Sequence, residues 1–196
     1  MIETQYRTRY PRLVQAAAAI EQQLRGYLEG TLHVDRVSAR AKSIDRFVAK
    51  ANKIENGSLK YSDPLSQIQD QIGARIICFY LSDVEIISSL IEKYYRPIES
   101  KSLIPDSEWE FGYFGKHFIL LMPTDAIDEG EGEEQMPEFF ELQIKTLFQH
   151  AWSEANHDLG YKPGTKPLTS DEKRYLALTA AQAWGADKIF EELSKR

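Results

Sequence analysis

Cysteine is almost absent from this sequence: Cys78 is the only one, and it lies in an apolar run. A single thiol cannot form an intramolecular disulfide, and it cannot supply a zinc site built from cysteines. We therefore expect Cys78 to be a buried, inert thiol.

Long apolar runs are missing as well. No stretch of the 196 residues approaches the roughly 20 apolar residues that a membrane-spanning helix needs. The N-terminus has no basic segment followed by an apolar one, as a secretory signal would have. With 42% hydrophobic and 28% charged residues, the composition predicts a cytoplasmic globular protein without a membrane partner.

Positive charge is in deficit, since the formal net charge is -6. That balance argues against broad non-specific binding of nucleic acid, although a local basic patch is compatible with it. The sequence has no internal repeat. It also has no glycine-rich GxxxxGK[ST] loop, so a bound nucleotide would need another kind of phosphate-binding site. We expect a single domain over residues 1–196.

A strand with one polar face is the most informative feature that the sequence does contain. Residues 138–145 alternate apolar and polar side chains, which predicts a strand. Its polar face presents Glu141, Gln143 and Lys145 together, because successive side chains of a strand point to opposite faces. An acid, an amide and a base on one face suit a site, although ordinary solvated strands show the same alternation.

A helical pattern follows this strand directly, and His150, Glu154 and His157 fall at positions i, i+4 and i+7 on one of its faces. A polar helix face that meets a polar strand face is what a cleft needs, but a solvated surface gives the same pattern. The three side chains also have the spacing for a metal site, yet no second set of ligands accompanies them. Surface or supporting roles are the preferred interpretation.

Cations gather in residues 36–54, which we predict to form a helix. Arg36 and Arg40 are one i,i+4 pair, and Arg46 and Lys50 are another. Such a cluster suits a polyphosphate, whose adjacent charges a guanidinium can bind in a bidentate manner. A solvated helix face would look the same, so charge alone leaves both interpretations open.

The remaining patterns predict an α+β fold, a mixed sheet of four or five strands with flanking helices. The apolar run that contains Cys78, residues 74–80, is the best candidate for a central strand. It begins a strand–crossover–strand unit. Amphipathic helices at both ends of the chain are expected to pack, the last of them on the sheet. The predicted strands are 74–80, 97–104 and 112–122, and the predicted helices are 4–28, 84–94 and one that begins at Thr169 or Ser170.

Four stretches carry a resemblance to a known family. They are Arg40-Ala41-Lys42 with Lys50, Asp70-x-x-Gly73-x-Arg75, Gly112-Tyr113-x-x-x-His117, and Glu141-Leu142-Gln143-Ile144-Lys145-Thr146 followed by His157 and Tyr161-Lys162. Each motif is weak alone, but in this order over residues 36–162 they resemble the synthetase domain of the RelA/SpoT family. The chain looks like a small stand-alone member, which implies a nucleotidyltransferase-like fold without the hydrolase or regulatory regions of long members.

The resemblance implies a transferase of the pyrophosphokinase type. Such enzymes move a pyrophosphate from ATP to the ribose 3′-hydroxyl of GDP or GTP and make the stringent-response alarmone (p)ppGpp. By analogy, Asp70 and Glu141 hold magnesium, and Glu141 also accepts the proton of the attacking hydroxyl. Arg75 completes the catalytic set by fixing the phosphates or the carboxylates.

The resemblance also implies a division of the site between two nucleotides. ATP would be bound by the basic segment, in which Arg40 can stack on adenine as a planar cation. Tyr113 would stack on the acceptor base. The implied ATP-binding residues are Arg40, Lys42, Arg46 and Lys50, and the implied acceptor-binding residues are Tyr113, His117, Gln143 and Lys145.

The chain departs from the family pattern mainly on the acceptor side. No arginine between Arg75 and Arg96 would serve as a second clamp on adenine. Arg46 replaces a serine, Glu108-Trp109-Glu110-Phe111 replaces a Pro-Lys-x-Asn sequence, Gly115 replaces a serine and Lys145 replaces an arginine. Pyrophosphate transfer is therefore better supported than the identity of its acceptor.

Two other functions stay open. The same chemistry could use an adenine nucleotide or the 3′ end of tRNA as acceptor, as in toxic small members of the family, although the acidic net charge disfavours tRNA. The fold could also serve as a non-catalytic nucleotide-binding module. Family members often assemble as tetramers through terminal helices, so a homo-oligomer is an expectation that the spacing does not decide.

Overall fold

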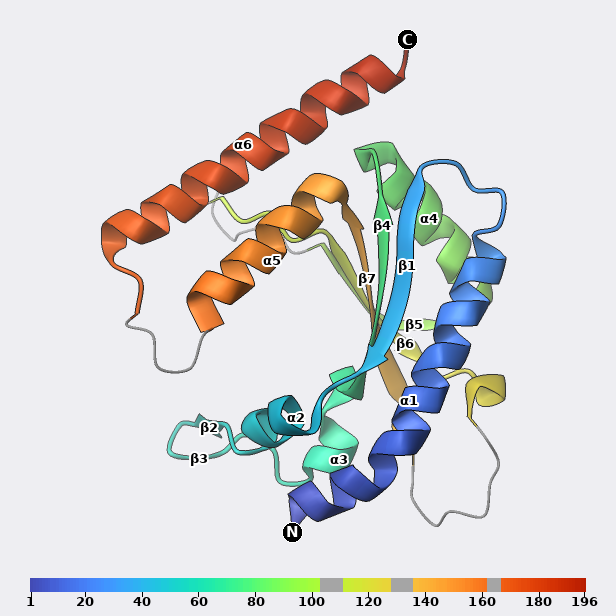
Figure 1. The fold of residues 1–196 in the computed structure, drawn as a ribbon, viewed down its shortest axis with the longest axis vertical. Coiled ribbons are helices and arrows are strands. Elements are labelled where there is room, and N and C mark those ends of the chain that lie inside the picture. Colours follow the sequence, from blue (N-terminus) through green and yellow to red (C-terminus); the bar gives the residue numbers. More distant parts are fainter. Residues whose placement is uncertain (103–110, 128–135, 162–166) are drawn as a thin grey trace.

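A five-stranded mixed sheet forms the centre of the computed structural model, which describes residues 1–102, 111–127, 136–161 and 167–196. Its strands lie in the order β1 (Val34–Ala41), β4 (Ile72–Cys78), β7 (Phe139–Thr146), β6 (Lys116–Leu121) and β5 (Pro97–Ser102) (Figure 1). β4 and β7 run parallel, and the other neighbours are antiparallel. The predicted α+β fold with a mixed sheet is confirmed.

Helices cover the two faces of the sheet unequally. α1 (Ile2–Tyr27) and α4 (Leu81–Tyr94) share a core with the apolar face, where Phe140, Leu142 and Ile144 of β7 are fully buried. α5 (Leu147–Tyr161) begins directly after β7 and contacts β7 and β4, and α6 (Ser170–Ser194) packs on α5 and α4 (Figure 1). The expectation that the last helix packs on the sheet is therefore wrong.

The connection from β4 through α4 to β5 is the predicted crossover, but its two strands are not neighbours. β7 and β6 lie between them in the sheet. The shorter elements are a two-stranded ribbon of β2 (Ile54–Glu55) and β3 (Ser58–Leu59), the helix α3 (Pro64–Gln67), and the 3-10 turns η1 (Gln69–Gln71) and η2 (Thr124–Ala126). In the described parts of the chain, no helix has the length and apolar character to cross a membrane.

The basic segment is not the single helix that we predicted. It forms β1, a turn, and the short helix α2 (Ile44–Ala51). A spacing of four places two residues on one face of a strand as well as on one face of a helix, so the Arg36/Arg40 pair could not distinguish the two. Pairing along all of β4 decides for the strand.

Helix α1 protects the free edge of β1. Glu21 accepts a hydrogen bond from the amide of Ala39 at 2.9 Å, and the Arg25 guanidinium donates to the carbonyl oxygen of Val37 at 2.5 Å. An unpaired strand edge would otherwise invite pairing with another chain. α1 thus fixes the strand that carries Arg40.

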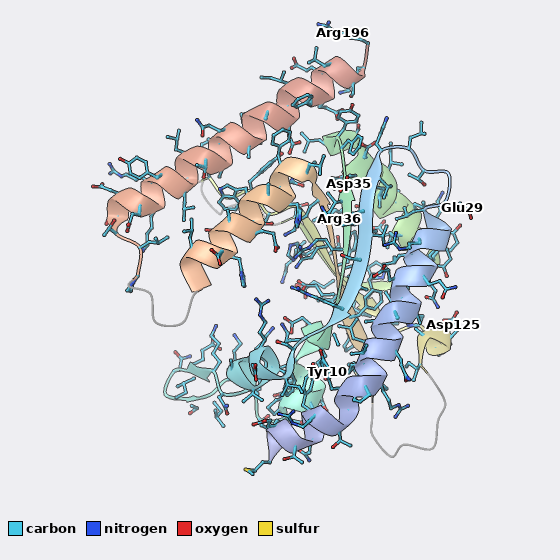
Figure 2. All side chains as sticks on the ribbon, in the orientation of Figure 1. Tyr10, Glu29, Asp35, Arg36, Asp125 and Arg196 are labelled. Carbon is cyan, nitrogen blue, oxygen red and sulfur yellow. The ribbon has the colours of Figure 1, made fainter. Side chains whose placement is uncertain are left out.

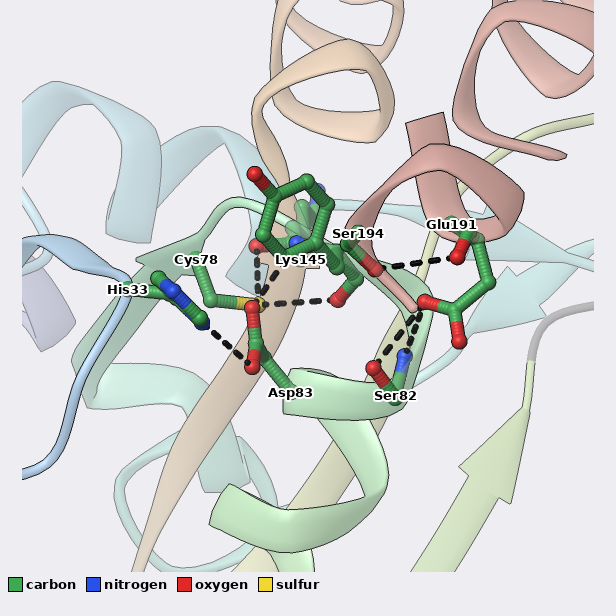
Figure 3. Close-up of polar contacts among 8 residues, drawn as sticks. His33, Cys78, Ser82, Asp83, Lys145, Glu191 and Ser194 are labelled. Carbon is green, nitrogen blue, oxygen red and sulfur yellow. Dashed lines mark hydrogen bonds and ion pairs between the residues drawn. The ribbon is translucent and has the colours of Figure 1, made fainter. Parts of the chain in front are cut away.

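The ends of β4 and β7 meet α4 and α6 in a small polar junction (Figure 3). The Cys78 thiol donates to the carbonyl oxygen of Lys145 at 3.4 Å, and burial raises the pKa of this thiol well above its ordinary value. The expected buried cysteine is confirmed. Glu191 of α6 accepts hydrogen bonds from the amide and the hydroxyl of Ser82, both at 3.0 Å, at the start of α4.

Asp187 is the second anchor of α6, and its side chain is fully buried. Its Oδ2 accepts hydrogen bonds from the Tyr113 hydroxyl at 2.6 Å and from the Thr146 hydroxyl at 2.5 Å. Burial raises the pKa of this carboxyl above its ordinary value, and the two hydroxyl donors only partly oppose that effect. A buried carboxyl group therefore joins α6 to the end of β7.

We expect Asp187→Ala to lower the free energy of unfolding by about 2–4 kcal/mol, because two buried hydroxyls lose their acceptor. Asp187→Asn keeps an acceptor oxygen and should cost less. A raised folded pKa means that the contribution of Asp187 is largest below the unfolded value and is lost as pH rises through the folded value. In urea unfolding, the wild type should gain stability over Asp187→Asn as pH falls from neutral; a constant difference would contradict this.

Candidate active site

A cavity of about 560 Å³ lies on the polar face of the sheet, between β1, β4, β7, η1 and the start of α2. It gathers side chains from segments that are far apart in the sequence. Seven residues predicted for the site line it: Arg40, Lys42, Arg46, Asp70, Arg75, Glu141 and Gln143. The predicted catalytic residues therefore share one cavity.

Strand register explains why these side chains meet. Arg40 pairs with Gly73, which pairs in turn with Glu141. Directly paired residues point to the same face of a sheet. Gly73 has no side chain, so space remains between the Arg40 guanidinium and the Glu141 carboxylate. A Cβ at Gly73 would meet no atom within 4 Å. The neighbouring row brings together Ser38, Arg75, Gln143 and His117.

Asp70 is held by two lysines at one side of the cavity. Its carboxylate lies 2.9 Å from Lys42 Nζ and 2.9 Å from Lys50 Nζ. Burial alone would raise the pKa of Asp70, but attraction and hydrogen bonding to the two ammonium groups outweigh burial and lower it. Lys50 thus reaches the site through Asp70.

A buried network fixes the backbone at this corner. The Tyr6 hydroxyl donates to the carbonyl oxygen of Lys42 at 2.7 Å, and the Tyr6 ring stacks on Phe47 with centroids 3.7 Å apart. The amide of Lys42 donates to the carbonyl oxygen of Gln71 at 2.8 Å, and Arg9 donates to the Gln71 side chain at 3.2 Å. α1, α2 and η1 are therefore tied together around Asp70.

Glu141 is held by His117 from the neighbouring strand β6. His117 Nδ1 lies 3.1 Å from Glu141 Oε1, and because an ionised carboxylate only accepts, the imidazole donates. Burial would raise the pKa of Glu141, but the hydrogen bond and the charge of His117, together with a hydrogen bond from Gln143, outweigh burial and lower this pKa. Within the described residues, His117 Nε2 and Gln143 Oε1 are buried without a hydrogen-bond partner. Two polar atoms beside the carboxylate are thus available for a ligand.

Arg75 links the cavity to α5. Its guanidinium lies 3.0 Å from the Glu154 carboxylate and 3.4 Å from His150 Nδ1. Lys145 is almost fully buried nearby, and its ammonium donates to the Ser153 hydroxyl at 2.9 Å. Burial, and then repulsion by Arg75, lowers the pKa of Lys145 to about 8. Lys145 does not line the cavity.

Tyr113 also lies away from the cavity. Its ring is buried beside Trp152 and Ala180, between α5 and α6, and its hydroxyl is bound to Asp187. The structure therefore brings together nine of the eleven predicted site residues, counting Lys50 and His117 through their partners, and leaves Tyr113 and Lys145 outside this group.

Comparison with known proteins gives the family. A family model described as a region found in RelA / SpoT proteins matches residues 39–166, which is more than half of the chain. The chain belongs to the RelA/SpoT family. The GTP pyrophosphokinase YjbM of Bacillus subtilis (strain 168) is 29% identical over 168 residues, covering 83% of this chain and 71% of the relative. By this homology the chain is a GTP pyrophosphokinase-like enzyme.

Solved structures of the RelA/SpoT family show the same fold. Small alarmone synthetase 1 from Bacillus subtilis, bound to its product pppGpp, superimposes with a TM-score of 0.75 at 22% identity and covers 98% of this chain and 97% of that one. A GTP pyrophosphokinase family protein from Streptococcus pneumoniae has a TM-score of 0.76 at 22% identity, with 96% and 92% covered. The predicted family and fold are confirmed.

The glycine that replaces the RelA/SpoT motif serine has a structural reason in this chain. Gly115 has φ of +85°, a conformation that side chains rarely adopt. A Cβ there would lie 2.7 Å from the carbonyl oxygen of Ile144 and 2.8 Å from Lys145 Cγ. The loop before β6 thus approaches β7 too closely for a serine.

The donor atoms of this RelA/SpoT site fit magnesium. Two carboxylates, Asp70 and Glu141, line one cavity, and Asp70 acts to raise the pKa of Glu141, so the two negative charges interact. Gln143 Oε1 is a third oxygen on the same wall. Magnesium takes one or two carboxylates and fills its other positions with water and substrate oxygens. The described residues contain no group of three or more His, Cys, Asp or Glu that could hold a metal alone, and Glu154 is instead paired with Arg75.

Some RelA/SpoT motif positions fall outside the described residues. These are Glu108, Trp109 and Glu110 of the altered acceptor loop, and Lys162 of the last motif. The predicted start of the last helix lies within the described residues, where Thr169 and Glu172 form a capping box. The predicted helix start is confirmed.

Sequence reasoning missed several residues of the cavity wall, and Tyr10 is the largest of them. Tyr10 extends from α1 (Figure 2). It lines the same cavity as Arg40 and Arg46. The sequence did contain a signal for Tyr10, which lies at helical spacing from Tyr6 and Leu13. Both of these residues are buried, so the apolar face of α1 extends to its first turns. Periodicity could not reveal that this part of α1 passes the edge of β1.

Proposed function

We propose that this enzyme transfers the β,γ-pyrophosphate of ATP to the ribose 3′-hydroxyl of GDP or GTP, giving (p)ppGpp. The observation that most supports this proposal is that Asp70 and Glu141 share a cavity with the cations of β1 and α2. Homology to GTP pyrophosphokinases supports the reaction class.

The lysines beside Asp70 suit the donor phosphates. In the free protein Lys42 and Lys50 both contact the Asp70 carboxylate. A bound triphosphate offers them a larger negative charge, so we propose that they turn from Asp70 to the phosphates of ATP. Arg40 and Arg46 line the same wall and would complete the donor contacts.

Glu141 is the proposed general base. Its lowered pKa keeps it ionised at neutral pH, and His117 holds its orientation. The 3′-oxygen forms a bond to the β-phosphorus of ATP while the bond from that phosphorus to the α,β-bridging oxygen breaks. The hydroxyl proton passes to Glu141, and AMP leaves with the bridging oxygen.

Magnesium is part of the proposal, with Asp70 and Glu141 as its protein ligands. When bound, it would neutralise charge on the transferred phosphates. The side chains themselves position the reactants, and Arg75 at the cavity wall adds a fixed positive charge.

The acceptor nucleotide is proposed to lie beside His117 and Gln143, whose buried unpaired atoms can bind polar groups of a nucleoside. A role for Tyr113 in stacking on the base would require its ring to leave the contact between α5 and α6. Acceptor identity is therefore best tested directly.

The test of the function is incubation with ATP labelled on its γ-phosphate, magnesium, and one of GDP, GTP, ADP, AMP or tRNA. We expect the label to move to GDP and GTP. Label that moves only to an adenine nucleotide or to tRNA would keep the chemistry and overturn the acceptor. Folded protein that labels none of them would favour a nucleotide-binding module.

Tyr10 should contribute to ATP binding through ring contact with the nucleotide. We expect Tyr10→Ala to weaken binding of a non-hydrolysable ATP analogue about three- to tenfold, the usual value of an aromatic contact. Calorimetry measures this affinity, and Tyr175→Ala, which removes an exposed tyrosine of α6, is the matched control. Equal affinity in the two variants would remove Tyr10 from the site.

A further inference from the structure

Two carboxylates, Glu141 and Glu154, lie within reach of Arg75, the cation that β4 contributes to the cavity. Arg75 pairs with Gln143 of β7, two residues after Glu141. Arg75 and Glu141 are therefore diagonal neighbours on one face of the sheet, a separation that long side chains span. Both side chains line the same cavity. The register would thus allow the guanidinium to pair with the proposed base.

Helix α5 supplies the partners that Arg75 has instead. The Glu154 carboxylate lies 3.0 Å from Arg75 Nη2, and His150 Nδ1 lies 3.4 Å from Arg75 Nη1. His150 and Glu154 are four residues apart, so they share one face of α5. Burial and then the charge of Arg75 lower the pKa of His150, so its ring is neutral at neutral pH and Nδ1 can accept a hydrogen bond. Two residues of the polar helix face thus hold one cation of the sheet.

The charge of Arg75 acts mainly on the α5 side of the cavity. Burial would raise the pKa of Glu154, but the charge of Arg75 is the largest of the effects that outweigh burial and lower it. The pKa of Glu141 is shifted mainly by burial and then by its own neighbours, His117 first among them. The proposed base is therefore ionised without sharing the guanidinium.

Exposure to water explains what the Glu154 charge prevents. The side chain of Glu141 is 23% exposed, and that of Glu154 is 53% exposed. Ion pairs are stronger where less water screens them, so Arg75 would gain by turning to Glu141 if Glu154 lost its charge. In the intact protein the guanidinium stays on α5, because α5 offers it two acceptors and Glu141 is already bound to His117.

We propose that Glu154 is a positioning residue, which holds Arg75 against α5 and so keeps the guanidinium off Glu141. The inference rests on the proposed function and adds to it the reason why the base stays open to a metal ion and to the hydroxyl proton. Arg75 remains at the cavity wall, where it can meet phosphates, whereas Glu154 does not line the cavity. Glu154 acts through Arg75 alone.

The first test is the magnesium dependence of transfer by Glu154→Gln. This change removes a charge and keeps the size of an exposed side chain, so the variant should fold. We expect the magnesium concentration for half-maximal transfer to rise about 5- to 20-fold, because Arg75 then competes with the metal for Glu141. The rate at saturating magnesium should stay within about threefold of the wild type. A rate that falls equally at every magnesium concentration would overturn the proposal, since general damage to the cavity has that effect.

Two further variants make this test specific. Glu85→Gln is the matched control, because Glu85 is an exposed helix glutamate that pairs at 3.1 Å with Lys116, a part-buried strand cation outside the cavity lining. It should have the magnesium dependence of the wild type. In an Arg75→Gln background, Glu154→Gln should leave the magnesium dependence of the residual transfer unchanged, since the competing guanidinium is gone. A further rise in that background would show that Glu154 acts without Arg75 and would overturn the proposal.

Crystal structures separate this inference from the proposed function, because they need no transfer activity. In Glu154→Gln without nucleotide, we expect a guanidinium nitrogen of Arg75 within about 3 Å of the Glu141 carboxylate. That contact would support the positioning role even if the wild type transfers label to no acceptor and the proposed function fails. An Arg75 side chain that stays on α5, or that turns to solvent, would overturn the positioning role at any level of activity.

Discussion

Glu141→Gln should reduce pyrophosphate transfer by about 1,000-fold or more while the protein stays folded and binds ATP. The amide keeps the size of the side chain, but it cannot accept the hydroxyl proton. It also removes one of the two carboxylates that face the cavity, so the metal and the base are lost together. Initial rates with GDP or GTP, together with calorimetry of an ATP analogue, measure the two effects separately.

The matched control for this prediction is Glu138→Gln, which changes an exposed glutamate just before β7. We expect that variant to have wild-type rates. Full activity of Glu141→Gln would exclude Glu141 as base and as metal ligand, and the account would then need another proton acceptor. Loss of both transfer and ATP binding would instead indicate that the change damages the cavity.

Asp70→Asn should lower the rate of transfer by about 100-fold or more and leave ATP affinity unchanged or higher. The variant loses a magnesium ligand, but it also releases Lys42 and Lys50, which Asp70 holds in the free protein. Released lysines can bind phosphates without first breaking an ion pair. The rate of transfer should therefore fall, while the affinity for an ATP analogue stays the same or rises.

The same substitution should destabilise the free protein by about 1–3 kcal/mol, because two part-buried ammonium groups lose their partner. ATP should restore part of that loss, since the phosphates replace the carboxylate. Asp45→Asn, an exposed change in the first turn of α2, is the control and should alter neither rate nor stability. Wild-type transfer by Asp70→Asn would contradict the assigned role.

The central strand of the site was predictable because its signal is local. Alternation along residues 139–146 fixes which side chains face the core and which face the cavity, and a register slip of one residue would bury Glu141 and expose Phe140. α5 follows without a loop, so its position was predictable too. Local periodicity thus predicted both β7 and α5, whose Glu154 contacts Arg75.

The basic segment of the site, residues 36–54, was harder to predict because its charge spacing fits a strand and a helix equally well. Arg36 and Arg40 share a face in a strand and in a helix alike, and only pairing with β4 decides between the two. The short helix α2 that follows begins after Ser43 and adds Arg46 and Lys50. Most of the predicted cations therefore reached the cavity although the predicted element was wrong.

Contacts between distant segments carry no local signal, and they account for what the sequence did not reveal. Tyr10 lines the cavity only because α1 passes the edge of β1. The Tyr113 ring lies under α6, and its hydroxyl donates a hydrogen bond to Asp187 of that helix, 74 residues later in the sequence. Lys145 lies in the predicted motif, yet its burial against Ser153 depends on how α5 packs on the sheet.

Phosphorus NMR of the reaction products shows whether a pyrophosphate moves to a ribose 3′-oxygen. With ATP, GDP and magnesium, we expect AMP and, in equal amount, a guanosine nucleotide that carries a pyrophosphate on its 3′-oxygen. Formation of ADP or free phosphate from ATP, with GDP unchanged at its 3′-oxygen, would contradict this expectation.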